Sequence, residues 1–222
     1  MQAGRLQDMI QRGMGRAAMA LGDWCDAYRP DGAGDPLDMR HRFMRLQASF
    51  SPPGKPFESP PGYGQAAWWG VFDAAYTRAG DYIVRMESRR GAADGGVWFV
   101  AAQQPLLPVL CVRASRVVTL ARPHAPGAPG LNDYGGVSLA TATMLLTKWP
   151  ASVLSMRGDG LDHAGLPADA ADGSWHVLLP APHGVTLRGG DLMTDDLGRT
   201  GVVVAAELTD LGWRLQVKQA AT

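Results

Sequence analysis

The side chains that could do chemistry gather in one acidic stretch of the chain. His163 follows Asp162 directly, and Asp159, Asp169 and Asp172 lie in the same stretch. A histidine beside carboxylates can act as a general base that an acid holds in place, and the same groups can bind a metal ion. They are also typical of a solvated acidic loop. We favour the loop, because no other histidine stands at a spacing that would complete a metal site.

Other motifs of catalysis and metal binding are missing from the sequence. The five histidines form no HExxH pair, and neither a Gly-x-Ser-x-Gly nucleophile motif nor a phosphate-binding Gly-Lys-Ser/Thr loop occurs. Gly158-Asp159-Gly160 and the group Asp191, Asp195 and Asp196 lack the ordered ligand spacing of a calcium loop. The sequence therefore predicts no catalytic residue, no metal site and no cofactor, and we expect a protein that is not an enzyme.

The composition favours a folded protein that contacts other proteins more than nucleic acid. The 222 residues carry 21 Lys and Arg against 21 Asp and Glu, whereas a dedicated nucleic-acid binder usually has a basic excess. Cys25 and Cys111 have no metal-type spacing, and we expect two buried free thiols. No apolar run approaches the roughly 20 residues of a membrane span. The first residues lack the apolar core of a signal peptide.

Residues 4–24 are predicted to form a helix. Apolar residues recur there at steps of three and four, so they fall on one stripe. Gly13 weakens the helix by up to about 1 kcal/mol relative to Ala, but it lets another backbone approach closely. The stripe can pack on its own domain or dock on a neighbouring subunit, and the sequence leaves both open. The interface candidates in this helix are Leu6, Met9, Ile10 and Met14.

Two proline-rich segments supply the other candidates for contacts with partners. Residues 51–64 hold five prolines and three glycines, which exclude a helix or a central strand and predict a long exposed loop. Phe57 and Tyr63 are the large side chains of this loop. Leu106 and Leu107 lie between two prolines, so they fall at a sheet edge or in a loop. There they form either a contact patch or a cap on a barrel end.

A short β-type pattern occurs twice in the chain. Gly80-Asp81 begins one copy, which ends at Val97–Gln104, and Gly190-Asp191 begins the other, which ends at Gly201–Leu208. Each copy consists of a Gly-Asp turn, a short strand, a polar turn with Gly, and a β-rich strand that closes on Ala-Ala. The Asp of each pair is expected to bind the backbone of its own turn.

Aligning the two copies extends the repeat over both halves of the chain. The strands expected around the first Gly-Asp hairpin are 42–49, 65–72 and 116–120, the last of them closing the first half. Those expected around the second are 153–156, 174–179 and 213–218, with a further strand at 137–148. Each half has too few strands for a large open sheet, and closure into a small barrel would remove the free edges.

The predicted fold class is mainly β, with two small β-barrel or β-sandwich-like repeats and an N-terminal α-helix. We expect the helix and a linker over residues 1–36 and the first barrel-like domain over 37–122. A Pro/Gly linker over 123–136 and the second barrel-like domain over 137–222 follow.

The doubled pattern resembles the small β-barrel of tailed-bacteriophage head–tail connector proteins, the stopper or head-completion group. The resemblance is carried by Gly80-Asp81 with Trp98-Phe99-Val100, and by Gly190-Asp191-Leu192 with Gly198 and Val202-Val203-Val204. It implies a structural virion protein that forms a ring or collar at the connector or tail. Its partners would be further copies of the chain and portal, adaptor or tail proteins, with incidental contact with packaged DNA.

The resemblance also implies assembly in the bacterial cytoplasm and a final place in the virion, with no membrane. The helix 4–24 and the loops 51–64 and 157–173 would then reach the neighbours. Two barrels in place of the single barrel of the family leave the station open among stopper, adaptor, hub, collar and fibre attachment. The alternative is a β-rich ligand- or carbohydrate-binding module, for example of a tail hub, because the chain has seven Trp residues.

Overall fold

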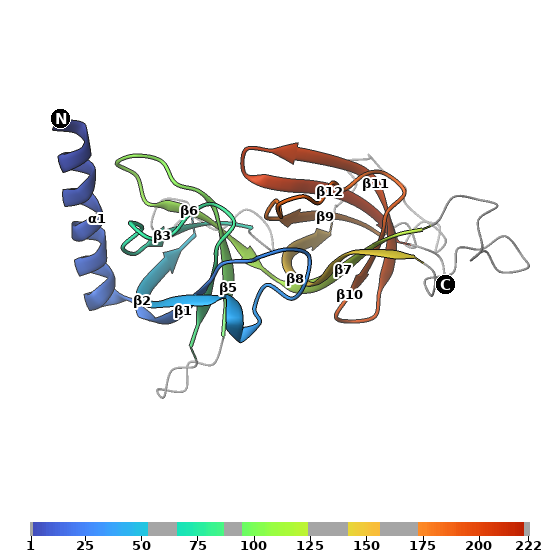
Figure 1. Cartoon of the computed structure of the whole chain (residues 1–222), viewed down its shortest axis with the longest axis horizontal. Coiled ribbons are helices and arrows are strands. Elements are labelled where there is room, and N and C mark those ends of the chain that lie inside the picture. Colours follow the sequence, from blue (N-terminus) through green and yellow to red (C-terminus); the bar gives the residue numbers. More distant parts are fainter. Residues whose placement is uncertain (1, 53–65, 87–94, 124–141, 156–172, 220–222) are drawn as a thin grey trace, which may run out of the picture.

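The protein consists of one helix and two closed β-barrels. A computed structural model describes residues 2–52, 66–86, 95–123, 142–155 and 173–219. Within them α1 (Gln2–Leu21) precedes twelve strands, and a short 3-10 helix (Met39–His41) precedes β2 (Figure 1). The first barrel contains β1 (Asp23–Tyr28), β2 (Arg42–Ser51), β3 (Ala67–Val71), β4 (Tyr82–Arg85), β5 (Val97–Ala102) and β6 (Val109–Ala114). The second contains β7 (Arg116–Arg122), β8 (Thr143–Ser155), β9 (Ser174–Leu179), β10 (Leu192–Asp195), β11 (Thr200–Thr209) and β12 (Gly212–Gln219).

The second barrel repeats the topology of the first. The strand order around the first barrel is β1-β2-β3-β6-β5-β4, and around the second it is β7-β8-β9-β12-β11-β10. Neighbouring strands are antiparallel throughout. Each sheet closes because its first and last strands pair, β1 with β4 and β7 with β10. The predicted fold class, mainly β with two barrel-like repeats and an N-terminal helix, is confirmed.

The two Gly-Asp turns are equivalent down to their main-chain hydrogen bonds. Gly80 and Gly190 have φ angles of 92° and 90°, in the region that favours glycine. Their N–H groups donate to Val100 and Val203 respectively, each over 2.8 Å. A β-bulge follows each of these valines. Val100 of the first barrel therefore corresponds to Val203 of the second. The alignment expected from the sequence, which superimposes the two Ala-Ala pairs, is wrong by one residue.

Each Gly-Asp carboxylate is buried and binds an arginine as well as its own turn. Asp81 is 1% exposed, and its Oδ2 accepts the N–H of Arg78 over 2.9 Å. The guanidinium of Arg29, just after β1, donates to both carboxylate oxygens over 2.9 and 2.8 Å and to the carbonyl of Tyr76. These hydrogen bonds raise the pKa of Arg29 further above its ordinary value.

The second barrel contains the same clamp. Asp191 is also 1% exposed, and it accepts the N–H of Arg188 over 2.9 Å and both donors of Arg122 over 2.8 and 2.9 Å. Arg122 also donates to the carbonyl of Thr186, just as Arg29 donates to the carbonyl of Tyr76 in the first barrel. The expected bond from each Asp to its own turn is confirmed. The arginine of each clamp was not predicted, because it lies more than fifty residues from its aspartate in the sequence.

The predicted end of the helix was wrong. The apolar stripe predicts a helix through residue 24, whereas α1 ends at Leu21 and Trp24 lies in β1. The chain turns at Gly22 from α1 into β1, close against β2. A Cβ at Gly22 would lie 2.7 Å from the backbone of Ala48, so no larger residue fits there. The first strand of the first barrel therefore lies inside the segment that was expected to be helix and linker.

The predicted boundary between the barrels was also wrong. The expected closing strand of the first half, 116–120, is part of β7, which pairs with β8 and β10 of the second barrel. Only Ser115 separates β6 from β7, and no Gly or Pro marks the change over residues 109–122. The Pro/Gly segment 123–136 follows β7, and from residue 124 onward it lies outside the described residues.

One long strand replaces two of the expected ones. The sequence predicts separate strands at 137–148 and 153–156, whereas β8 runs from Thr143 to Ser155 through Pro150. Lys148 takes a left-handed φ of 56°, so the chain bends without leaving the sheet. This bend places the next residue, Trp149, in the core between the barrels.

A shared apolar core joins the two barrels into one body. Trp149 of β8 is 0% exposed, and its ring meets that of Tyr82 of β4 edge to face at 6.1 Å. The indole N–H donates to the carbonyl of Gly34 over 2.8 Å, and the Tyr82 hydroxyl donates to the carbonyl of Pro150 over 2.8 Å. The barrels lie side by side along the long axis of the molecule, with α1 at the free end of the first (Figure 1).

Candidate interaction surface

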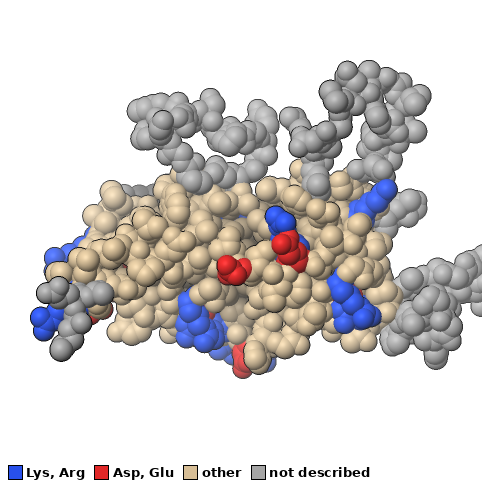
Figure 2. All heavy atoms as spheres, turned by 90° about the horizontal axis from the view of Figure 1, so that it is seen from above, with Lys and Arg blue, Asp and Glu red and all other residues tan. Residues whose placement is uncertain are grey.

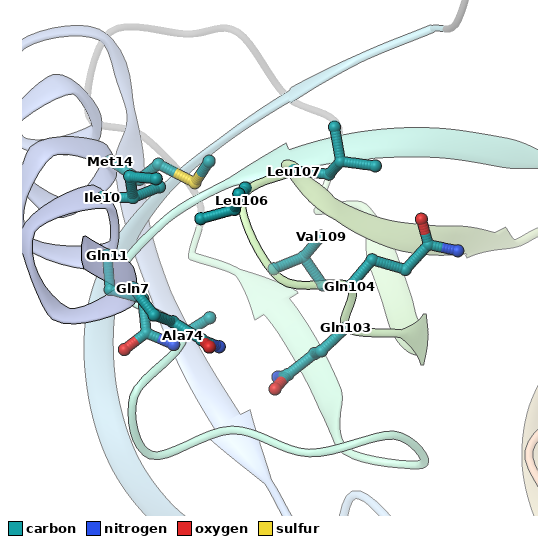
Figure 3. A pocket seen from close by; sticks show the side chains of 10 residues that line it. All are labelled: Gln7, Ile10, Gln11, Met14, Ala74, Gln103, Gln104, Leu106, Leu107 and Val109. Atoms are coloured by element: carbon teal, nitrogen blue, oxygen red, sulfur yellow. The ribbon is translucent and has the colours of Figure 1, made fainter. Parts of the chain in front are cut away.

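The helix and the β5–β6 loop meet around a small hollow, which brings two groups of predicted interface residues together. Ile10 and Met14 of α1 and Leu106 and Leu107 of the loop all line it (Figure 3). Leu106 lies opposite Met14 and Ile10, whereas Leu107 lies further from the helix. The hollow has a volume of only about 30 Å³, so it is a seam between two elements rather than a ligand pocket.

Four amide side chains give this seam a polar rim. They belong to Gln7, Gln11, Gln103 and Gln104. Gln103 Nε2 donates to Thr77 Oγ1 over 2.7 Å, which ties the loop to the barrel. The seam thus has an apolar centre and an amide rim, and it joins α1 to the loop within the same molecule.

The β5–β6 loop contains a strained residue. Leu106 has a φ of 70°, a left-handed conformation that is unfavourable for a side chain of this size by roughly 1–2 kcal/mol. Leu106 and Leu107 are 51% and 49% exposed, and each stands directly beside a proline. The barrel therefore holds two half-exposed leucines, one of them on strained backbone, and such strain concentrates at functional positions.

The helix packs on the first barrel along one side and is exposed on the other. Ala18 is buried, and Gly15 approaches the turn that follows β3 so closely that a Cβ would lie 3.2 Å from that of Asp73. An added Cβ at Gly13 would meet nothing within 4 Å. Leu6 and Met9, on the same side of the helix as Gly13, are 45% and 61% exposed. The apolar stripe is therefore wider than the barrel surface that covers it.

Further apolar side chains are exposed near the end of α1 and in β1. Met19, Leu21 and Trp24 are 62%, 78% and 55% exposed. Of the interface candidates, Ile10 and Met14 are half-buried in the seam, while Leu6 and Met9 face solvent. Phe57 and Tyr63 lie outside the described residues, as do most of the loops 51–64 and 157–173. The predicted helical stripe places Trp24 with the packed residues, but Trp24 lies in β1 and faces solvent.

The two thiols lie in the core of the first barrel, where burial makes them unreactive. Cys25 and Cys111 are both free and 0% exposed. Burial raises the pKa of Cys25 to about 12, despite the opposing charge of Arg85, and it raises the pKa of Cys111 as well. The thiolate form that reacts with electrophiles is therefore scarce at neutral pH.

We expect neither thiol to react with a thiol reagent while the protein is folded. Titration at mildly alkaline pH should detect no accessible thiol in the native protein and both thiols after denaturation. Rapid labelling of native protein at either position would show that the first barrel opens far more often than this core allows.

The titratable groups of the described residues form no metal-binding cluster, and those on the face seen in Figure 2 are dispersed. No group of three or more His, Cys, Asp or Glu side chains in that part of the chain could hold a metal ion. The acidic stretch around His163 lies outside it. Figure 2 shows acidic and basic side chains standing in small separate groups on one face, among a surface that is mostly uncharged. None of the helices described has the length and apolarity of a membrane span.

Comparison with known proteins places the chain in no family. No family model matches it, and no solved structure matches it. A galactose-1-phosphate uridylyltransferase of Bacillus subtilis (strain 168) is 38% identical over 72 residues. That match covers 32% of this chain and 13% of the relative. The chain thus shares a short segment with part of a much longer enzyme.

Proposed function

We propose that the chain is a structural protein of a tailed-phage virion or a prophage-derived particle. It would form a ring or collar at the head–tail connector or tail, through contacts between copies and with portal, adaptor or tail proteins. The observation that carries this proposal is the apolar area at the free end of the molecule. Leu6, Met9 and Leu106 are exposed there, around a helix of which only one edge packs on a barrel.

The physical argument starts from the cost of this exposed area. Exposed apolar side chains gathered at one end of a molecule often mark a contact with another protein. Burying the exposed part of Leu6 or Met9 contributes on the order of 1 kcal/mol for each side chain. The space around Gly13 allows a neighbouring backbone to come close. A ring requires a contact between two different surfaces, and α1 at one end of an elongated molecule provides one of them.

We expect Leu6→Glu combined with Met9→Glu to break the assembly of copies without unfolding the protein. Both side chains are exposed in the single copy, so the thermal midpoint should change little, whereas an assembled contact would bury two carboxylates in an apolar area. Size-exclusion chromatography with light scattering measures the mass of the particles. The wild-type chain should be an oligomer, and the variant should be a monomer.

Met39→Glu is the matched control, because Met39 is 68% exposed on the 3-10 helix of the same barrel but outside the α1 area. It should leave the oligomer intact. A wild-type monomer at high concentration, or an oligomer that the α1 variant does not affect, would count against the proposal.

A ligand-binding module is the second candidate, and one observation favours it. A pocket of about 200 Å³ lies between the barrels, lined mainly by apolar residues that include Phe99, Val112, Leu178 and Trp213. Carbohydrate binding usually uses exposed tryptophans. Trp98, Trp149, Trp175 and Trp213 are buried, and Trp24, which is 55% exposed, does not line this pocket. A saturable change in tryptophan fluorescence with a small apolar ligand, lost in Leu178→Arg, would favour this candidate.

A further inference from the structure

The apolar pocket of about 200 Å³ between the barrels, called the inter-barrel pocket below, has the size of a large side chain. Its walls come from β5 and β6 of the first barrel and from β9 and the β11–β12 hairpin of the second, and they include Phe99, Val112, Leu178, Leu211 and Trp213. A benzene molecule occupies an engineered apolar cavity of about 150 Å³. The inter-barrel pocket therefore has room for one side chain such as Met or Leu.

The mouth of the inter-barrel pocket combines an exposed leucine with a net negative charge. Leu211, in the turn of the β11–β12 hairpin, is 47% exposed. Arg214 lines the pocket, and Glu207 lies directly opposite it on β11 and binds it. Opposite residues of an antiparallel pair share one face, so Glu207 stands on the side of the hairpin that borders the pocket. Asp210, in the same turn, is also exposed.

The exposed side of α1 has the opposite charge. Met9 is the more exposed of its two apolar candidates, at 61% against 45% for Leu6. Arg5 precedes Met9 by four residues and Arg12 follows it by three, so both lie beside it on the helix surface. Three of the four charged residues of the helix are arginines, and all four are exposed: Arg5, Asp8, Arg12 and Arg16.

We propose that α1 of one copy docks at the inter-barrel pocket of the next copy, with Met9 in the pocket and Leu6 at its mouth. This supplies the second surface of the contact between copies, so it rests on the proposed assembly. A chain cannot fill its own pocket in this way, because its helix packs on β2 and β3 at the free end of the first barrel (Figure 1).

The two surfaces match in shape, polarity and charge. The unbranched thioether side chain of Met9 adapts to an irregular apolar pocket. The arginines beside it approach Glu207 and Asp210, and opposite charges across an interface steer the encounter and fix the orientation. The contact joins two different surfaces, so copies add in one direction and close into a ring when the rotation between them allows it.

Two variants that each lose one of the surfaces test the contact when they are mixed. Leu6→Glu with Met9→Glu alters the helix and keeps the pocket, whereas Leu211→Glu keeps the helix and places a carboxylate at the pocket. Each variant alone is expected to be a monomer, because docking would bury a carboxylate against apolar side chains. In an equal mixture one intact helix meets one intact pocket, so sedimentation velocity should show a one-to-one dimer. Its dissociation constant should be at least about tenfold below that of either variant alone.

A substitution of the same kind elsewhere on the second barrel is the matched control. Leu197, on the β10–β11 turn, is 58% exposed and does not line the pocket. Leu197→Glu should therefore assemble as the wild type does. Both altered leucines are largely exposed in the single copy, so neither change should lower the thermal midpoint noticeably.

Engineered cysteines test which surfaces meet, because the natural thiols are buried. A Met9→Cys chain mixed with a Leu211→Cys chain should give a mixed disulfide on mild oxidation. Met9→Cys mixed with Leu197→Cys measures the background of random collisions. Crosslinking of position 9 to position 211 that is no stronger than to position 197 overturns the proposed docking.

The remaining outcomes separate this docking from the proposed assembly. Unchanged assembly in Leu211→Glu overturns the docking and leaves the assembly role standing. A mixture that stays monomeric also overturns it, and assigns α1 to a contact with α1 of another copy. A small apolar ligand that binds in the inter-barrel pocket of the intact oligomer without dissociating it assigns the pocket to that ligand instead. A wild-type chain that stays monomeric overturns the docking and the assembly together.

Discussion

Replacement of Trp149 by Ala is expected to lower the free energy of unfolding by about 3–5 kcal/mol, at least as much as the loss of either buried Gly-Asp carboxylate. The indole fills the core between the barrels, where it is 0% exposed and packs against Tyr82. The change leaves a cavity too large for this core to close, and it leaves the carbonyl of Gly34 without its donor. Denaturant unfolding followed by circular dichroism measures the loss.

Two milder changes separate packing from hydrogen bonding at the same place. Trp149→Phe keeps most of the apolar volume and removes the indole donor, and Tyr82→Phe removes only the hydroxyl that donates to Pro150. Each should cost about 1–2 kcal/mol. If Trp149→Ala cost no more than these, the two barrels would not share a core, and each would unfold independently of the other.

Asp81→Ala is expected to lower the free energy of unfolding by about 3 kcal/mol, and Asp191→Ala by a similar amount. Each carboxylate is buried and accepts the N–H of its own turn as well as two donors of an arginine. Loss of the carboxylate leaves that turn N–H without an acceptor. Arg29 is one-third exposed and can turn to water, which keeps the cost at the lower end of the range for buried pairs.

The repeat supplies an internal control for this prediction. Because the two clamps have the same partners and nearly the same distances, similar losses are expected in both barrels. Glu207→Ala removes an exposed ion pair with Arg214 and should cost less than about 1 kcal/mol. Losses this small for both Asp81→Ala and Asp191→Ala would mean that the arginines pack without help from the carboxylates.

Local patterns in the sequence predicted the repeated parts of the fold. Strands β9 and β12 have alternating side chains, and the Gly-Asp turns need a left-handed glycine, so both follow from neighbouring residues. Closure of the barrels followed from the small number of strands in each half. These features depend on contacts close in the chain or on general rules of sheets.

The features that the sequence did not predict depend on partners far away in the chain. The boundary at Ser115 has no local marker, because β6 and β7 are both apolar and continuous in sequence. The role of Arg29 depends on Asp81, more than fifty residues later, and no spacing rule connects them. In the interaction surface, sequence periodicity identified Ile10 and Met14, but only the fold shows that Leu106 meets them.

Electron microscopy of tailed particles with a gold-labelled antibody against the full chain tests the central claim most directly. A structural virion protein predicts gold at one fixed station on intact particles, at the head–tail junction or along the tail, and annular assemblies in the purified chain. Particles that carry no label, while the chain remains a free monomer in the same lysate, would contradict the proposed function.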